Sequence, residues 1–260
     1  MIGYHFEGYQ VANKLIPRET FLISLPIVGE TRSTNGKIKN WGDHISSSPR
    51  DALFYEHGWY CAKVQLIGNI IEKEYATCEG RESITNYFSP ARKYLTNYVD
   101  MTQVLQVWAL DCAERVAHKS LSKNNFLRKI IEAGRAYLRE EITYEDMVKI
   151  ERVQKQHMER YAKNNDAEVA VFYAYATLNP SLSFCKDGFK YFNVSRPAFY
   201  CAESAVYAAD DIGKEVYWQH CRLTELLETE FAKTSGLSTD HIIIGGQFGG
   251  ASNWIQTNLG

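Results

Sequence analysis

Three histidines near the start of the chain are the side chains best suited to acid–base chemistry. They are His5, His44 and His57, and an imidazole titrates near neutral pH. A fold that brought them into one cleft would give that cleft proton donors and acceptors. No Ser or Cys in a nucleophile motif accompanies them. The alternative interpretation is therefore that these histidines cap loops or lie at the surface.

The six cysteines are scattered along the sequence and include no CxxC pair. Cys112, Cys201 and Cys221 stand in helix-like runs beside Ala, Val and Leu, which favours reduced thiols that pack as small core residues. Only His220 and Cys221 lie close together, and adjacent residues point in different directions on a helix. The sequence therefore predicts no metal site and a cytoplasmic protein.

Two charge pairs in the middle of the chain have helical spacing. Asp111 and Arg115 are four residues apart on one predicted helix, and Glu132 and Arg135 are three residues apart on the next. This spacing places the members of each pair on one helix face. Two interpretations stay open: the charges hold the two helices together, or they line a polar groove in the bundle.

The segment 184–200 combines many aromatic rings with charged residues. It has little helical periodicity, so we expect a loop of about 14 residues between two helices, which is a length typical of functional or disordered loops. The segment is too aromatic for disorder. We predict that this loop covers one end of the bundle and binds a partner through Phe189, Tyr191 and Arg196. The alternative is that its rings only close the end of the bundle.

Short alternating runs and turn residues dominate before residue 88. Residues 59–67 alternate in hydrophobicity as a strand does, and residues 21–25 suggest another strand. Between them, Ser48 is a good N-cap and Pro49 suits the first position of a helix that should run to about Glu56. These elements predict a small α+β module over residues 1–88.

From about residue 100 the hydrophobic period becomes helical. Helices are expected to begin near Asp100, Asn124 or Asn125, Thr143, Asp166, Ser195 and Ile212. The predicted fold class is thus α+β, in which the N-terminal module is followed by a mainly helical bundle over residues 100–233. Residues 234–260 include a glycine-rich stretch without the P-loop lysine, and we expect them to form a C-terminal arm or tail.

Composition narrows the class of function. Among 260 residues, 29 Lys and Arg stand against 31 Asp and Glu, a formal charge of −2 that argues against nucleic-acid binding. No run reaches the roughly 18 apolar residues of a membrane helix, and the start does not resemble a signal peptide. The chain contains 17 Tyr, 12 Phe and 5 Trp. So many aromatic residues suit a large core or a protein–protein interface, which includes the interface of a homo-oligomer.

Two motifs in the helical half resemble a known family. They are residues 105–116 (LQVWALDCAERV) and 128–142 (RKIIEAGRAYLREEI), with a weaker match at 218–223. Over residues 100–232 the chain resembles immunity proteins of bacterial toxin systems, which also occur in phage genomes. The middle helices differ from that family in having few alanines and many tyrosines. The resemblance implies a phage or bacterial-conflict protein that binds and inhibits a partner enzyme, which is a host protein or a toxin or defence protein.

The first part of the chain carries two further resemblances. Residues 42–46 followed by 49–53 are similar to a small module of phage proteins. The start of the chain also resembles ADP-ribosyltransferase folds. Those folds open with a strand bearing a Tyr-His pair, as residues 3–5 do here, and later have a serine-rich strand like residues 46–48.

The transferase resemblance implies an alternative function, an enzyme that uses NAD. His5 would hold the nicotinamide ribose beside Ser46, and Glu72 would polarise the acceptor, with Glu74 and Glu79 as further candidates by position. The inhibitor needs no cofactor, because it acts by occluding a site with aromatic and charged anchors. We favour the inhibitor, since the sequence contains no strong nucleophile, metal or nucleotide motif.

Overall fold

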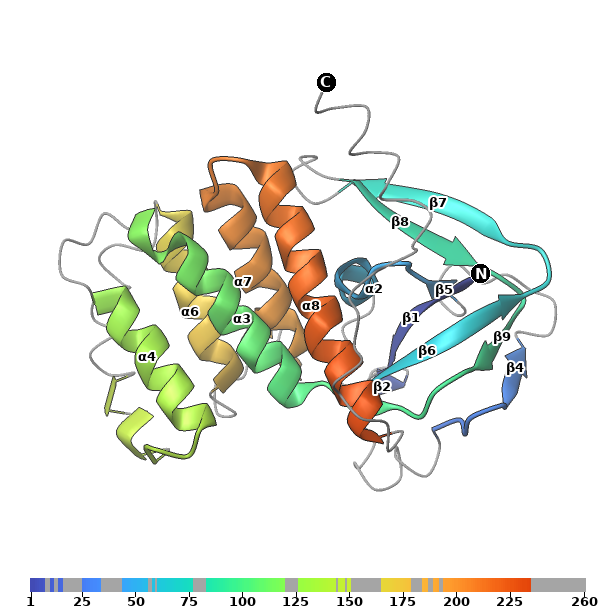
Figure 1. Cartoon of the computed structure of the whole chain (residues 1–260), viewed down its shortest axis with the longest axis horizontal. Coiled ribbons are helices and arrows are strands. Elements are labelled where there is room, and N and C mark those ends of the chain that lie inside the picture. Colours follow the sequence, from blue (N-terminus) through green and yellow to red (C-terminus); the bar gives the residue numbers. More distant parts are fainter. Residues whose placement is uncertain are drawn as a thin grey trace.

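Strands gather at one end of the molecule and most helices at the other, with one short helix between them (Figure 1). The computed structural model describes residues 1–7, 10–11, 14–15, 25–33, 44–55, 58, 60–76, 83–119, 126–143, 145–147, 149–150, 165–178, 184–186, 189–191 and 194–234. In these residues the fold class is α+β, as the sequence predicts.

The strands of the first part form antiparallel sheets. The larger sheet has the order β1 (Ile2–Glu7), β6 (Tyr60–Ile67), β9 (Ala91–Tyr94) and β4 (Thr31–Ser33), and β10 (Val99–Asp100) also pairs with β6. A second sheet has the order β5 (His44–Ile45), β8 (Ser83–Phe88) and β7 (Ile71–Ala76), and β2 (Gln10–Val11) pairs with β3 (Lys14–Leu15). A bridge between Tyr4 and Ser46 joins the two main sheets, with reciprocal backbone N–H···O distances of 2.9 and 3.2 Å.

The larger sheet has two different faces because side chains alternate along a strand. Tyr4 and Phe6 of β1 belong to the main core, which they share with α2 and the helical bundle. His5 and Glu7 of the same strand point to the opposite face. On that face Val64 of β6 lies in a smaller core that strand β5 also covers.

The first module is longer than the sequence suggested. Its predicted end was residue 88, but β9 pairs with β6 and β10 extends the same sheet to Asp100. Both strands are too short for an alternating pattern to reveal them, since β9 has 4 residues and β10 has 2.

Most predicted helices are confirmed. They are α2 (Pro49–Tyr55), α3 (Thr102–Val116), α4 (Phe126–Leu138), α6 (Asp166–Leu178), α7 (Ser195–Ala208) and α8 (Ile212–Thr234), and the 3₁₀ turn η1 (Ala117–Lys119) follows α3. Ser48 caps α2 as predicted, because its Oγ accepts a hydrogen bond from the Asp51 N–H at 3.3 Å. No helix in the described ranges is long and apolar enough to cross a membrane.

Small residues let the bundle helices approach closely. Ala109 of α3, Ala174 of α6 and Ala202 of α7 are fully buried. Gly134 brings α4 against its neighbours, because a Cβ there would lie 2.8 Å from Leu178 Cδ1. The indole of Trp108 is fully buried in this core and donates a hydrogen bond to the backbone oxygen of Gln219 at 3.1 Å.

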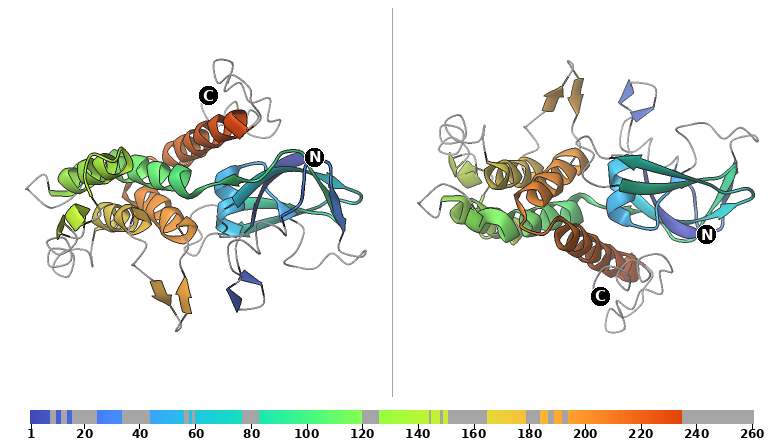
Figure 2. Two further views of the ribbon diagram at one scale, coloured as in Figure 1. Left: turned by 90° about the horizontal axis from the view of Figure 1, so that it is seen from below. Right: turned by 90° about the horizontal axis from the view of Figure 1, so that it is seen from above.

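The segment between α6 and α7 corrects the predicted loop. It contains a two-stranded antiparallel hairpin, β11 (Phe184–Lys186) and β12 (Phe189–Tyr191), which projects from the bundle in both views of Figure 2. The sequence carried the signal, since an Asp-Gly dipeptide at 187–188 separates two runs in which aromatic residues alternate. The expected loop is therefore a β-hairpin over these strands, which the lack of helical periodicity does not distinguish from a loop.

Some predictions fall outside the described residues. They concern His57 and Glu79, most of the strand suggested at 21–25, the helix expected beyond Ile150, and the C-terminal arm at 234–260 apart from its first residue. For His44 the structure describes the backbone in β5 and not the side chain.

Candidate functional site

His5 lies in a buried polar cluster on the face of the larger sheet that is turned away from the bundle. Its Nε2 is 3.2 Å from Glu7 Oε1. The same carboxylate oxygen accepts hydrogen bonds from Arg92 Nη2 at 3.1 Å and from the Tyr94 hydroxyl at 3.2 Å. Arg92 Nε also donates to the Tyr94 hydroxyl at 2.6 Å. His5 is 1% exposed, so the cluster is closed to solvent at this point.

Burial and charge set the ionisation of this cluster. Burial by itself raises the pKa of Glu7, but the hydrogen bond and charge of His5, together with Arg92 and Tyr98, outweigh it and hold that pKa at about 2. Burial raises the pKa of Tyr94 to about 12, and it raises the pKa of Tyr98 further. At neutral pH the cluster therefore contains the ionised carboxylate of Glu7, and the neighbouring side chains donate hydrogen bonds to it.

The three residues of the transferase hypothesis do not meet. Ser46 is paired with Tyr4, and residues opposite one another in an antiparallel pair share a face. The side chain of Ser46 therefore lies on the Tyr4 face, where its hydroxyl donates to Asn86 Oδ1, whereas His5 points to the other face. Glu72 is exposed on β7 in the second sheet. The structure does not bring His5, Ser46 and Glu72 into one cleft.

The predicted charge residues hold helices together, but with different partners from those expected. Arg135 Nη2 of α4 donates to Asp111 Oδ1 of α3 at 2.8 Å and to Glu114 Oε2 at 2.5 Å. Arg222 Nε of α8 donates to the other Asp111 oxygen at 2.7 Å. Asp111 therefore joins three helices, which supports the first of the two interpretations.

The two pairings within single helices are wrong. Arg115 Nε donates to Glu215 Oε2 of α8 at 2.8 Å, and its guanidinium lies 4.1 Å from the ring centroid of Trp218. Glu132 is exposed on α4 and takes no part in this network of described residues. Carboxylates on neighbouring helices are more buried than the local partners, so the arginines gain more by reaching across the bundle.

A second buried network joins α2 to α8 and had no signal in the sequence. Arg50, which is 1% exposed, donates from Nε to Gln219 Oε1 at 3.0 Å. Gln219 in turn donates to the backbone oxygen of Ala202 at 2.9 Å. His220 Nδ1 lies 2.7 Å from Ser48 Oγ, and burial, together with the charge of Arg50, lowers the pKa of His220. The contacts of Arg50 with Gln219 and of Ser48 with His220 connect residues about 170 positions apart, beyond the reach of local patterns.

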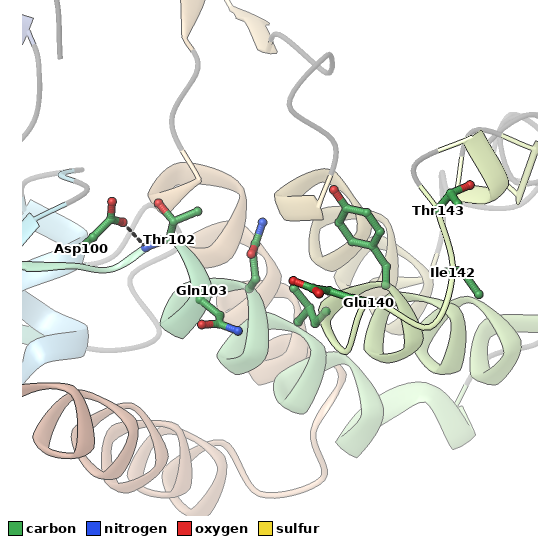
Figure 3. Close-up of a pocket in the computed structure, with 9 residues that line it drawn as sticks. Asp100, Thr102, Gln103, Glu140, Ile142 and Thr143 are labelled. Atoms are coloured by element: carbon green, nitrogen blue, oxygen red, sulfur yellow. Dashed lines mark hydrogen bonds between the residues drawn. The ribbon is translucent and has the colours of Figure 1, made fainter. Parts of the chain in front are cut away.

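An open groove of about 640 Å³ lies between the start of α3 and the end of α4 (Figure 3). Nine residues line it: Asp100, Thr102, Gln103, Gln106, Tyr137, Leu138, Glu140, Ile142 and Thr143. Its volume lies within the usual range of ligand pockets, about 300–1,000 Å³. The sequence predicted only that a helix begins near Asp100, because the lining residues from α4 are not near it in the chain.

The groove is built on fixed backbone. Asp100 Oδ1 accepts a hydrogen bond from the Thr102 N–H at 2.9 Å, which holds the start of α3 (Figure 3). Gln106 Nε2 donates to the backbone oxygen of Thr177 at 2.9 Å and so ties α3 to the end of α6. Glu140 ends α4 with a φ of 60°, in the left-handed region that favours glycine. Hydrogen bonds from helices and caps therefore set the shape of the groove.

The hairpin and the groove lie at the same end of the bundle. The chain leaves the end of α6 beside Gln106, forms β11 and β12, and returns at the start of α7. Arg196 is the second residue of α7 and is half-buried. Phe189 and Tyr191 lie on β12, of which the structure describes the backbone. The predicted binding residues thus belong to the end of the bundle that carries the groove.

Three of the described cysteines have suppressed thiol reactivity. Cys61, Cys112 and Cys201 are buried, and burial raises the pKa of each thiol, so that they stay protonated at neutral pH. Within the described ranges no group of three or more His, Cys, Asp and Glu side chains has the arrangement of a metal site.

No protein-family model, curated protein or solved structure matches this chain. A function therefore has to follow from the chain's own residues and geometry. Two features stand out among the described residues: the closed polar cluster around Glu7 and the open groove at the end of the bundle. Of these two features, it is the groove that offers space to another molecule.

Proposed function

We propose that this protein binds a partner enzyme and inhibits it by covering a functional surface of that enzyme. The partner would be a host protein or a toxin or defence protein, met in the cytoplasm, as for immunity and anti-defence proteins of phage and bacterial conflict. The observation that carries the proposal is the open groove between α3 and α4, on the end of the bundle from which the β11–β12 hairpin projects.

An inhibitor of this type needs a surface that exists before the partner arrives, because ordering side chains and loops on binding weakens affinity. The helices around the groove are ordered by the ion pairs of Asp111 and by the close packing of Gly134. Partner binding therefore does not have to offset the free-energy cost of ordering this surface.

The hairpin supplies area that the groove lacks. A stable protein–protein interface covers about 800 Å² on each partner, which is more than a groove of this size offers. The strands β11 and β12 belong to the segment between α6 and α7 and carry Phe189 and Tyr191, aromatic residues of the type enriched in binding hot spots. Arg196 at the start of α7 adds a cation to the same end of the bundle.

The acid–base groups of the sheet module favour binding over catalysis. The carboxylate of Glu7 is already engaged by His5, Arg92 and Tyr94. A substrate would have to replace these partners before any of them could transfer a proton. The NAD-using alternative requires His5, Ser46 and Glu72 in one cleft, and no observation favours that arrangement.

Capture followed by an activity titration tests this function. The tagged full-length chain is incubated with host lysate, and the enzyme recovered in stoichiometric amount is purified and titrated with the chain. We expect enzyme activity to fall to a minimum at a fixed molar ratio. The triple variant Phe189→Ala, Tyr191→Ala, Arg196→Ala should fold normally and inhibit more weakly.

Two results would overturn the proposal. One is the absence of any stoichiometric partner from lysates of cells in which the protein is active. The other is a captured enzyme whose activity does not change at saturating amounts of the chain. A matched control is Lys214→Ala, which changes an exposed side chain in the first turn of α8.

A further inference from the structure

The chemistry of the groove identifies the kind of surface that it recognises. Building on the proposed function, we propose that the groove between α3 and α4 receives a Lys- or Arg-bearing segment of the partner protein. Three features of the groove carry this inference: its charge, the apolar part of its lining and its hydrogen-bond acceptors.

The groove has negative charge and no positive charge in its lining. Asp100 and Glu140 contribute carboxylates, and none of the nine lining residues is Lys, Arg or His. Arg139, next to Glu140 in the sequence, is not among the lining residues and donates two hydrogen bonds to Glu141, at 2.6 and 2.8 Å. A cationic side chain entering the groove would therefore meet two carboxylates without a competing cation among the lining residues.

The apolar part of the lining suits the stems of long basic side chains. Tyr137, Leu138 and Ile142 are half-buried and line the groove. Lys and Arg bury their methylene stems against apolar surface while their charged ends stay near polar groups. The ring of Tyr137 is also a site for cation–π contact with an ammonium or guanidinium group. An acidic or purely apolar segment would use only part of this surface.

Polar side chains add hydrogen-bond acceptors for the donors of a guanidinium or ammonium group. Gln106 donates from Nε2 to Thr177, which fixes its amide orientation and leaves the carbonyl oxygen as an acceptor. Gln103 and Thr102 also carry side-chain oxygens in the lining, whereas Thr143 Oγ1 already accepts a hydrogen bond from the Asp146 N–H at 3.3 Å. Arg has five N–H donors and Lys has three, and both lack an acceptor. The groove thus offers hydrogen-bond acceptors to a side chain whose polar groups are all donors.

Among the lining residues, Glu140 gives the most direct argument for a cationic ligand. Its side chain is exposed, and within the described part of the chain its carboxylate makes no hydrogen bond or ion pair. Its backbone has a φ of 60°, and such a conformation costs a non-glycine residue about 1 kcal/mol. This position therefore carries a carboxylate on a backbone that glycine would adopt with less strain.

A peptide-binding experiment on the full chain tests the inference. The probe is a fluorescein-labelled hexa-arginine peptide, followed by fluorescence anisotropy, and hexa-citrulline serves as the neutral control of the same shape. We expect saturable binding of hexa-arginine that weakens with added salt. Asp100→Asn and Glu140→Gln should each weaken binding by up to about fivefold, as for single exposed ion pairs, and the double variant more than either. Asn at 100 keeps a side-chain oxygen that can accept the hydrogen bond from the Thr102 N–H.

The matched control is Glu145→Gln, which removes one exposed negative charge near the end of α4 but outside the groove. It should leave the affinity for hexa-arginine within about twofold of the unchanged protein. Equal weakening by Glu145→Gln, or equal binding of hexa-citrulline, would overturn the inference. Equal affinity for spermine would also overturn it, because a free polyamine would then satisfy the groove without a protein segment.

The captured partner separates this inference from the proposed function. We expect excess hexa-arginine to release the partner and the double variant Asp100→Asn, Glu140→Gln to lose inhibition. A partner that is bound and inhibited equally well by the double variant would overturn the groove inference and leave the inhibitor function standing. Failure to capture any partner, with hexa-arginine still bound, would overturn the inhibitor function and support the groove's preference for basic side chains.

Discussion

At the scale of single residues, Glu7 is a carboxylate whose neighbours strongly lower its pKa. It accepts hydrogen bonds from Arg92 and Tyr94 and lies against His5 on a closed face of the sheet. Its pKa is about 2 in the folded protein and 4.5 in its ordinary state. The cluster therefore stabilises the fold through an ionised group, and this contribution depends on pH.

The predicted pH dependence follows from the sign of that shift. Because the folded pKa is lowered, the stabilisation is complete above about pH 4.5 and is lost as the pH falls through about 2. A shift of this size corresponds to about 3 kcal/mol. Urea unfolding of the unchanged protein should show this loss, and Glu7→Gln should be less stable at pH 7 and show a flatter dependence below pH 4.5. Identical slopes for the two proteins would contradict the assignment.

The residue partners in the bundle show what local sequence patterns cannot supply. The spacing of Asp111 and Arg115 predicted a pair on one helix, and both residues instead pair across the bundle, with Arg135 and Glu215. Helical spacing identifies which residues lie near one another on one helix. The spacing does not show which buried carboxylate of a neighbouring helix lies within reach. The position of that carboxylate decides the pairing.

At the scale of elements, the end of α4 gives a test of the strain at Glu140. The N–H of Glu140 donates to the Tyr137 oxygen and the N–H of Glu141 to the Ala136 oxygen, which is the glycine-type helix ending. Glu140→Gly should therefore stabilise the protein by about 0.5–1 kcal/mol. Glu141→Gly, at a position without positive φ, should not stabilise it. Thermal unfolding measures both, and a loss of stability in Glu140→Gly would contradict the assigned cap.

Close packing of α4 gives a second element-scale prediction. Alanine normally favours a helix over glycine by about 1 kcal/mol, but a Cβ at Gly134 would lie 2.8 Å from Leu178 and 2.9 Å from Leu110. Gly134→Ala should therefore destabilise the protein by about 1–3 kcal/mol, as overpacking does. Gly213→Ala is the matched control in α8, where the only atom near an added Cβ is at 3.6 Å. Equal stability changes in the two variants would contradict tight packing at α4.

Elements were predictable where the signal is local. The strand at β6 and the starts of α2, α6, α7 and α8 follow from alternation, capping residues and helical period. The strands β9 and β10 could not be found in this way, because they exist through pairing with β6. The hairpin could have been predicted from Asp-Gly at 187–188. The groove could not, since its two walls are separate helices.

At the scale of the whole molecule, the sheet module and the bundle share one core. Tyr4 belongs to that core and its hydroxyl donates to Glu228 of α8 at 2.8 Å, and Phe54 of α2 packs edge-on against Phe199 of α7. Arg50 connects α2 to Gln219 within the same interface. Two parts joined in this way should unfold together.

Calorimetry tests this cooperativity. We expect one unfolding transition for the full chain and one transition at lower temperature for Arg50→Met, which removes the donor to Gln219 and costs about 1–3 kcal/mol. Arg128→Met is the control, because it removes an arginine that is exposed on α4. Two separated transitions in the unchanged protein would show that the modules are independent.

The most direct measurement of the central claim is hydrogen–deuterium exchange of the chain, free and in complex with the captured enzyme. If the end of the bundle binds the partner, protection should appear in α3 at residues 102–106, at the end of α4 in residues 137–143, and along the strands 184–186 and 189–191. The exposed strand β7 should exchange equally in both states. Protection confined to the sheet module, with the groove unchanged, would contradict the account.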